Sequence, residues 1–446
     1  MEETICFEVK TMSKRNAYPP RFWPALVIFS LIGQVAWVVE NMYFNVFVYK
    51  MFHASASAIS AMVAASAVAA TLTTIVIGAW SDKIGRRKLF ICGGYILWGI
   101  SIACFALLRM DVLNPLFPSA AAAAAAGVSL TIALDCVMTF FGSSANDACF
   151  NAWLTDATAE SGRGAAEGVN AMMPLVAILV VFGGFMAFDL DKQQSWTAIF
   201  LIIGAVVLTI GLLGMWLIRE VPTDNPENHR FWGNILYGFR PSVVKANPLL
   251  YLTLAAFAVF NISIQIFMPY LILYYEVSLG MADYVLIMAP AILLASVVTA
   301  VYGRLYDRKG FLPSLLPSLA ALCAGYLVLF FFRQTALVFI GSLLMMCGYL
   351  TGMAVFGAMV RDRTPVGKAG MFQGLRIVGQ VLVPGVVGPA IGAAVLKNAE
   401  TIANNDGTSS FIPNQNIFLA ALAVIAVLAI ALIPIIRLLK KEKTDA

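Results

Sequence analysis

The stretch that decides the fold is GAWSDKIGRRK, Gly78 to Lys88. Its first glycine, its aspartate and its second glycine recur 225 positions later, in GRLYDRKG, as Gly303, Asp307 and Gly310. A second set, 206 positions apart, pairs Asp156, Thr158, Gly164 and Gly168 with Asp362, Thr364, Gly370 and Gly374. Two displaced sets in the same order indicate internal duplication, so the sequence predicts two homologous halves.

The composition places both halves in a membrane. Of the 446 residues, 61% are hydrophobic and only 12% are charged, whereas a soluble domain has about 25% charged residues. The seven cysteines form no CxxC pair and there are only two histidines, which indicates neither a disulfide framework nor a metal site. We therefore expect no cofactor, no metal and no enzymatic activity. The net charge of +5 requires no nucleic-acid partner.

The predicted membrane helices number twelve, because a helical span needs about 20 predominantly apolar residues. The first apolar run is too long for a signal peptide and is expected to be retained. The fourth begins with seven alanines, which are weakly hydrophobic. The predicted spans are 22–48, 57–80, 89–109, 120–156, 165–188, 196–218, 249–275, 282–303, 312–332, 335–360, 369–396 and 415–436.

Lysine and arginine placement predicts the orientation. With the N-terminus in the cytoplasm, 23 of the 29 basic residues fall in cytoplasmic segments, and five outer loops hold one each, as the positive-inside rule requires. We expect a monomer in the plasma (inner) membrane with both termini cytoplasmic. The expected divisions are a tail (1–21), a six-helix bundle (22–218), a linker (219–248), a second six-helix bundle (249–436) and a C-terminal tail (437–446).

GAWSDKIGRRK resembles the signature of the major facilitator superfamily between the second and third helices, G-x-x-x-D-x-x-G-R-[KR], at every fixed position. Two later stretches, FNAWLTDATAESGRGAAEG and VRDRTPVGKAGMFQG, are similar to bacterial members near the sugar–cation symporters. The second span, Ser57 to Trp80, has no acidic residue, which argues against sodium coupling of that type. The resemblance implies an all-α polytopic protein with two pseudo-symmetric bundles around a central cavity and alternating access to it.

The resemblance also predicts a cytoplasmic gate. The resemblance predicts that the loop of Asp82 packs against the start of the eleventh span, 367–370. By symmetry, the loop of Asp307 is expected to pack against the start of the fifth span, 162–164. A carboxylate in such a loop can cap a helix N-terminus and interact with its dipole. We expect Arg86 or Arg87 to pair with Asp156, and Arg308 with Asp362. These pairs would hold the cytoplasmic side shut in the outward-facing state and break when it opens.

Ionisable and amide side chains inside the spans need a reason, because a charge at the bilayer centre costs roughly 2.5–3.5 kcal/mol on insertion scales. In the first span they are Glu40 and Asn41, with Trp37 close to the Asn41 face. The fourth span carries Asp135, Asp147 and Asn151, of which Asp147 and Asn151 are i, i+4 neighbours. The remaining candidates are Asn261 and Gln265 in the seventh span and Gln373, Arg376 and Gln380 in the eleventh.

Arg376 is the basic residue that lies deep in a span. Such an arginine needs a carboxylate or an anionic ligand, and Asp147 lies at a matching depth, so we expect the two to pair. Amides can also serve as ordinary interhelical hydrogen-bond partners, and both tryptophans, Trp37 and Trp153, can simply pack.

These residues predict a mechanism of proton-coupled symport. Burial raises the pKa of a carboxyl group and a nearby cation lowers it, so Glu40 or an aspartate can exchange a proton as water access changes sides. Amide-rich helix faces beside aromatic rings suit a sugar or glycoside. H⁺ is expected as the coupling ion rather than Na⁺. The alternatives are proton-antiport efflux of amphipathic compounds and uptake of an organic anion held by Arg376.

Overall fold

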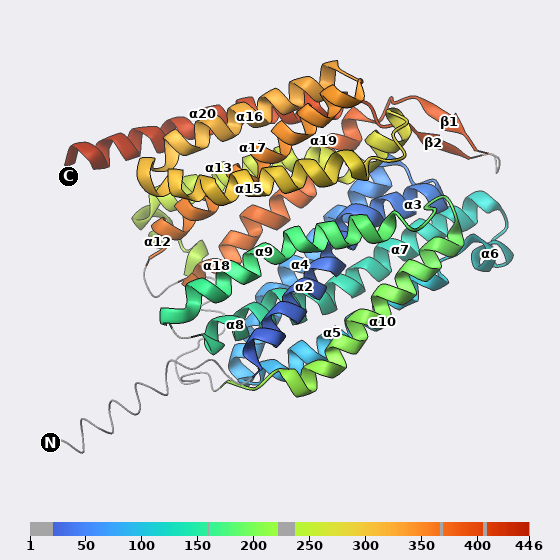
Figure 1. Ribbon diagram of the computed structural model, residues 1–446, viewed down its shortest axis with the longest axis horizontal. Coiled ribbons are helices and arrows are strands. Elements are labelled where there is room, and N and C mark those ends of the chain that lie inside the picture. The colour runs from blue at the N-terminus through green and yellow to red at the C-terminus, as the bar shows by residue number, and fades with distance from the viewer. Residues whose placement is uncertain (1–20, 159, 222–236, 366–368, 405–407, 446) are drawn as a thin grey trace.

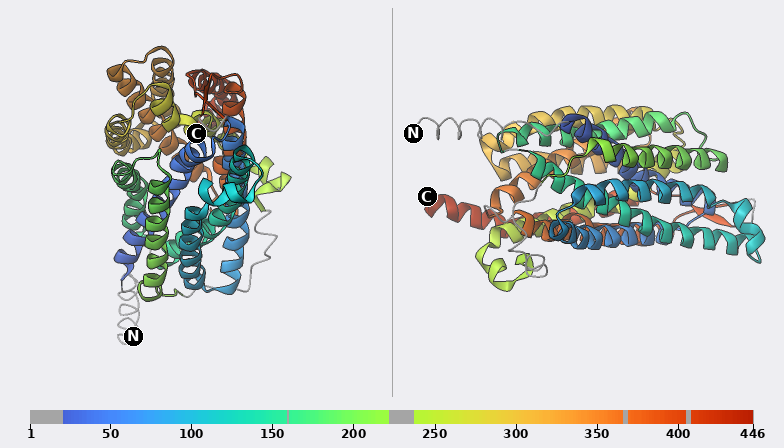
Figure 2. Two further views of the ribbon diagram at one scale, coloured as in Figure 1. Left: turned by 90° about the vertical axis from the view of Figure 1, so that its right-hand side faces the viewer. Right: turned by 90° about the horizontal axis from the view of Figure 1, so that it is seen from below.

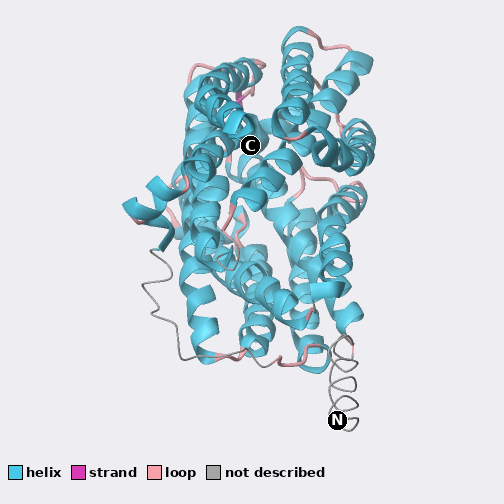
Figure 3. Ribbon diagram, turned by 90° about the vertical axis from the view of Figure 1, so that its left-hand side faces the viewer, coloured by secondary structure: helices cyan, strands magenta, loops and turns pink. Residues whose placement is uncertain are grey.

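The computed structural model describes residues 21–158, 160–221, 237–365, 369–404 and 408–445, and Figure 1 shows its helices lying side by side along the long axis. Helices make up nearly all of it (Figure 3). The first six spans comprise α2 (Phe22–Val38) with α3 (Phe44–Phe52), α4 (Ala56–Ile84), α5 (Arg87–Cys104), α7 (Ala120–Gly142) with α8 (Asn151–Ala157), α9 (Glu160–Phe185) and α10 (Gln193–Leu217). The last six comprise α13 (Pro248–Phe267) with α14 (Leu271–Leu273), α15 (Val285–Lys309), α16 (Phe311–Phe331), α17 (Thr335–Arg363), α18 (Ala369–Ile377) with α19 (Val383–Val395), and α20 (Asn416–Asp445).

The number of membrane helices is confirmed. Within the described residues, twelve helical segments are long and apolar enough to cross a membrane, and each overlaps one predicted span. The alanine tract forms the first two turns of α7 instead of a loop. Ser119 caps this helix by accepting a hydrogen bond from the Ala122 amide at 3.2 Å, as serine commonly does at a helix start. Asp135 is therefore well inside a continuous helix.

The twelve spans form two bundles. In the end-on view of Figure 2, the spans of the first half, coloured blue to green, group separately from the yellow to red spans of the second half. Close helix contacts within each bundle depend on small residues. A Cβ on Gly99 of α5 would lie 2.6 Å from the carbonyl oxygen of Gly204 in α10, so these two backbones meet at a distance that only glycine permits.

The repeated motif places a glycine with a positive φ at the end of a helix in both halves. Gly85 ends α4 with a φ of 67°, and Gly310 ends α15 with a φ of 79°. Both angles lie in the left-handed region, which glycine enters at little cost. The helix therefore ends at the repeated glycine in both copies, but the chain leaves it in different directions, because ψ is 18° at Gly85 and −171° at Gly310.

The two ends of the molecule differ. We call the end that holds Asp82 the motif end; α2 begins there and α20 finishes there (Figure 1). The opposite end carries α6 (Met110–Leu113) and a hairpin of β1 (Thr401–Ala403) and β2 (Ser409–Phe411). The short helix α12 (Pro241–Ala246) precedes α13.

Four spans contain a π-helical turn, which holds one more residue than an α-helical turn and often occurs at functional sites. Each turn carries one polar side chain of interest: Glu40 in the first span, Asp147 in the fourth, Glu276 in the seventh and Gln380 in the eleventh. The turns are η1 (Val39–Tyr43), η4 (Ser143–Phe150), η8 (Tyr274–Ser278) and η9 (Val378–Leu382), in the first, fourth, seventh and eleventh spans.

Candidate functional site

A cavity of about 330 Å³ lies between the two halves and contains most of the predicted site residues. Its described lining includes three carboxylates and no basic residue. The lining residues are Gln34, Trp37, Glu40, Asn41, Asn45, Met62, Val63, Ser66, Ala67, Ala70, Asp135, Thr139, Asp147, Gln265, Gln380, Val381 and Gly385.

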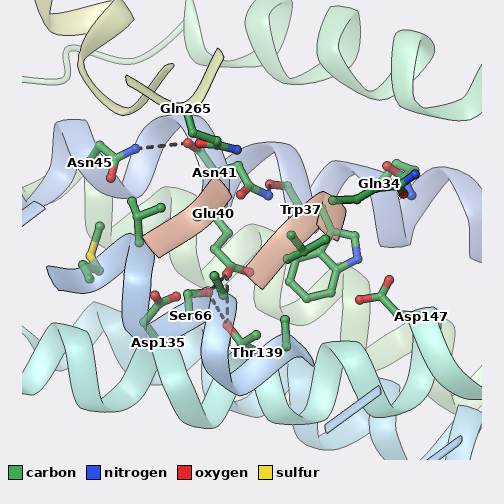
Figure 4. A pocket seen from close by; sticks show the side chains of 17 residues that line it. Gln34, Trp37, Glu40, Asn41, Asn45, Ser66, Asp135, Thr139, Asp147 and Gln265 are labelled. Atoms are coloured by element: carbon green, nitrogen blue, oxygen red, sulfur yellow. Dashed lines mark hydrogen bonds between the residues drawn. The ribbon is translucent and has the colours of Figure 1, made fainter. Parts of the chain in front are cut away.

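Glu40 is at the centre of a hydrogen-bonded cluster formed by three spans (Figure 4). Its Oε1 accepts a hydrogen bond from Ser66 Oγ of α4 at 2.6 Å and another from Thr139 Oγ1 of α7 at 2.9 Å. The two hydroxyl oxygens lie 2.9 Å apart. Two donors on one oxygen fix the carboxylate, and hydrogen bonds to charged groups are stronger than neutral ones.

Two carboxylates at the cavity wall, Glu40 and Asp135, each have an oxygen without a hydrogen-bond partner among the described residues. Glu40 Oε2 and Asp135 Oδ1 are buried and accept no hydrogen bond within the described part of the chain. Only 7% of Glu40 and 2% of Asp135 is exposed, and the two charges act on each other. A buried carboxylate oxygen without a donor costs free energy, so this pair is suited to taking up a proton or another small cation.

Asp147 lies at a different part of the cavity, beyond Trp37 (Figure 4). It is 12 residues after Asp135, or about 18 Å along the helix axis. Its Oδ2 accepts a hydrogen bond from Ser143 at 3.0 Å. The Trp37 ring packs against Trp98 with a centroid distance of 5.0 Å, so a second ring supports the indole that lines the cavity.

Amides complete the cavity from both halves. Asn41 lines it while donating to the Trp37 carbonyl at 2.8 Å, and Gln265 and Gln380 line it from the second half. Two predicted asparagines fall outside this lining. Asn151 donates to the Asp147 carbonyl at 3.3 Å and Asn261 to the Phe257 carbonyl at 2.9 Å, each within its own helix.

The predicted pairing of Arg376 with Asp147 is wrong for this conformation. Arg376 Nε donates instead to Gln380 Oε1 at 3.2 Å, one turn along the same helix, and no ion pair joins the arginine to Asp147 among the residues described. The two belong to opposite halves, and the cavity lies between the elements that carry them. The side chain of Gln373 lies outside the described part of the structure.

The motif end contains an ion-pair cluster around a buried arginine, and that arginine is Arg87, not Arg86. Arg87 Nε donates to Asp156 Oδ2 at 2.5 Å, and its Nη1 lies 2.8 Å from Asp82 Oδ1. Arg87 is the first residue of α5 and is buried, whereas Arg86 precedes the helix and is exposed. Only the residue inside the helix turns its side chain toward the bundle, so the helix start selects Arg87.

The second copy of the motif lacks the predicted Arg308–Asp362 pair among the described residues. Tyr306 Oη donates to Asp362 Oδ2 at 2.6 Å instead. Arg308 and Asp307 are exposed at the end of α15. Because no arginine follows Gly310 as Arg87 follows Gly85, a phenol takes the place of the guanidinium. The expected packing partners of these loops, 162–164 and 367–370, lie in part outside the described residues.

Ser66 is the cluster member that sequence reasoning missed. It lies in an alanine- and serine-rich helix, where one hydroxyl gives no signal by periodicity. Thr139 carried a weak signal, because it follows Asp135 by one helical turn. The close approach of Gly385 to Ala67, where an added Cβ would lie 2.6 Å from Ala67 Cβ, explains how α4 and α19 close one side of the cavity.

Comparison with known proteins agrees with this architecture. The family model described as Major Facilitator Superfamily matches residues 22–389. A mutant of the nucleoside transporter NupG is similar at 12% identity, with a TM-score of 0.69 and coverage of 92% of this chain and 98% of that one. No curated protein sequence shows a significant match.

Two further solved structures share the fold. A bacterial homolog of the human lysosomal transporter Spinster, in an inward-facing and occupied conformation, is 14% identical, with a TM-score of 0.69 and coverage of 94% and 98%. The xylose transporter XylE from E. coli is 14% identical, with a TM-score of 0.64 and coverage of 92% and 96%. At these identities the likeness concerns the fold alone.

Proposed function

The chain belongs to the major facilitator superfamily, and from that membership we propose that it is a secondary active transporter that couples uptake of a small polar solute to proton entry. The observation that carries this proposal is the buried Glu40 carboxylate, held by Ser66 and Thr139 at the cavity wall. A protonatable group with no cation beside it, in a cavity between two mobile halves, is what coupling to a proton requires.

The cavity divides into two parts with different roles. Glu40, with its two hydroxyl donors, and Asp135 form the proton part. Asp147, Trp37 and the amides form the solute part. About 18 Å of helix separates Asp135 from Asp147, so one group can change its protonation state while the other holds a solute.

A sugar or glycoside is the solute that this lining favours. Amide and carboxylate oxygens can accept from several hydroxyls, and the Trp37 ring can cover the apolar face of a sugar. One methionine, Met62, lines the described cavity, and an amphipathic efflux substrate would be better served by a more aromatic and methionine-rich wall. The xylose transporter among the structural neighbours is consistent with this choice.

An organic anion is the second candidate, and Arg376 favours it. The arginine is exposed, has no carboxylate partner among the described residues, and is hydrogen-bonded to the cavity residue Gln380. A solute carboxylate could supply the missing charge. Uptake of a sugar acid in preference to the neutral sugar would support this candidate.

We also propose that the protein is a monomer with both termini in the cytoplasm. Its two bundles then comprise residues 22–218 and 249–436. The distribution of basic residues supports this orientation. All three members of the Arg87 cluster belong to the first half, so we further propose that the cluster stabilises that half at the motif end and does not join the two halves.

Uptake into proteoliposomes tests the main proposal. Neutral sugars, glycosides and sugar acids are offered with an imposed pH gradient, with a sodium gradient, or with neither. We expect accumulation of one class driven by the pH gradient, and at least about a tenfold loss of that accumulation in Glu40→Gln, with solute exchange retained. Asp111→Asn, in an exposed pair with Arg109, is the control. Full gradient-driven accumulation by Glu40→Gln would refute proton coupling through Glu40.

A further inference from the structure

An ion-pair cluster at the opposite end connects the two halves through Lys50. Lys50 lies near the end of α3, and only 8% of its side chain is exposed. Its Nζ forms an ion pair with Glu276 of η8, in the second half, and a second one with Asp191 at 2.9 Å. Asp191 belongs to the loop between α9 and α10, so it is on the same half as Lys50.

The surroundings show that this end is closed. Tyr284 Oη, from the second half, donates to Tyr43 Oη at 3.2 Å, and Tyr270 Oη donates to the Ala56 carbonyl at 3.0 Å. All four groups are buried. Lys50 is thus one member of a seam that joins the halves beyond the cavity.

The β-hairpin extends this seam. Tyr49, next to Lys50, donates its hydroxyl to the Phe411 carbonyl at 2.6 Å and packs edge-on against the Phe411 ring. His53 Nδ1 hydrogen-bonds with Ser410 Oγ at 3.2 Å. A segment of the second half therefore rests on α3 of the first half, on both sides of Lys50 in sequence.

We propose that Lys50 is a two-partner switch that closes the outer entrance to the cavity. In the closed state it binds both carboxylates. When the second half turns away, the contact with Glu276 breaks while Asp191, which moves with Lys50, keeps its contact. Breaking a buried ion pair is costly chiefly because it leaves a charge without a partner, and Asp191 prevents that for Lys50.

The two carboxylates consequently have opposite effects. Glu276 can reach Lys50 only when the entrance is closed, so it stabilises the closed state. Asp191 is 79% exposed and Glu276 21% exposed. Asp191 is redundant in the closed state, where Glu276 is present, and is the remaining partner in the open state. It therefore favours opening.

This switch rests on the proposed transport function, because it assumes alternating access, and the helix that carries it also carries the proton part of the cavity. Lys50 lies ten residues after Glu40 in one continuous span, a rise of about 15 Å. A movement of α3 at the seam is therefore transmitted to the wall of the cavity.

The test is a distance measurement across the entrance by electron–electron resonance in nanodiscs. Spin labels are placed at Ser57 on α4 and Thr401 on β1, in a variant without native cysteines. We expect Glu276→Gln to raise the ratio of long to short distances about fivefold, the effect of one partly exposed ion pair, and Asp191→Asn to lower it by a similar factor.

The matched control is Lys192→Gln. Lys192 pairs with Asp189 at 3.0 Å in the same loop as Asp191, but both side chains are exposed and both are on one half. The Lys192 ammonium group keeps the pKa of the Asp189 carboxyl below its usual range by hydrogen bonding, with a smaller contribution from the Lys50 charge. We expect no change in the distance ratio.

Shifts of the same sign in Glu276→Gln and Asp191→Asn would overturn the switch, because a merely structural Lys50 responds equally to either loss. Unchanged ratios in both would also overturn it. If the labelled variants do not fold, a Lys50→Cys, Glu276→Cys pair in the otherwise native chain supplies the answer. A bifunctional thiol reagent should cross-link the two cysteines and abolish solute exchange, relative to the native chain treated in the same way, and failure to cross-link would count against the contact. Opposite distance shifts without transport of any tested solute would refute the proposed function and leave the switch intact.

Discussion

Ser66 Oγ lies 2.6 Å from Glu40 Oε1 and donates to it, so that a hydroxyl of the second span holds a carboxylate of the first. This contact connects two helices of one bundle at the cavity wall. It also determines how easily the carboxylate gives up or accepts a proton, because a donor to the ionised form stabilises that form.

Replacing Ser66 by alanine should therefore shift the pH dependence of uptake. Loss of the donor favours the proton-loaded carrier, so half-maximal uptake should move to higher pH, by about one unit for a hydrogen bond of about 1.4 kcal/mol. Uptake measured from pH 5 to pH 9 in proteoliposomes provides the check. Ser129→Ala, an exposed serine of α7 that donates to its own helix, should leave the profile unchanged.

Arg87→Gln should reduce the stability of the protein. Arg87 is 7% exposed and joins Asp82 to Asp156, so its loss leaves two carboxylates without their cation, at a cost of about 2 kcal/mol. The midpoint of thermal unfolding in detergent should fall by several degrees. Arg86→Gln should have little effect, since Arg86 is exposed, and an equal fall in both variants would show that the cluster is not the cause.

Asp147→Asn should weaken solute binding and leave pH-gradient-driven accumulation in place. Asp147 lines the solute part of the cavity, whereas Glu40 and Asp135 form the proton part. We expect KM for the solute found in the uptake panel to rise about tenfold, equivalent to about 1.4 kcal/mol, at every pH. Asn151→Ala, one turn away and off the cavity, is the control. Loss of pH-gradient-driven accumulation in Asp147→Asn, with solute exchange retained, would instead assign Asp147 to coupling.

Gly99→Ala should destabilise the first bundle. An added Cβ would lie 2.6 Å from the Gly204 carbonyl oxygen, and the backbones would have to separate at a cost of about 1–3 kcal/mol. Gly93→Ala, on the same helix, meets no atom within 4 Å and should be tolerated. Thermal unfolding of the two variants side by side gives the comparison, with similar midpoints contradicting the close contact.

The overall fold could be predicted because hydropathy and basic-residue placement are properties of single segments. A span such as 196–218 is recognisable without knowing its neighbours. The repeated motif also predicted that the chain consists of two homologous halves. Glu40 and Asp135 were predictable as well, because a carboxylate inside an apolar helix stands out against its own surroundings.

Partners across helices were harder to predict. Helix periodicity says which residues share a face, but not which neighbour that face meets. Asn41 and Asn261 each donate to a carbonyl of their own helix, yet of the two only Asn41 lines the cavity. Arg86 and Arg87 are adjacent, and only the start of α5 distinguishes them. Lys50 and Glu276 are 226 residues apart, and each had an ordinary explanation in its own segment.

The π-helical turn η1 has a mechanical consequence. This turn contains one residue more than an α-helical turn. Glu40 lies at the start of the turn, and Lys50 lies beyond the turn in the same span. If the surplus moves along the helix, the segment it crosses turns by about 100° and advances by about 1.5 Å, in the manner of a screw. The first span can therefore change the direction of a cavity side chain relative to the outer seam. The helix stays continuous, because only a few of its backbone hydrogen bonds change partner.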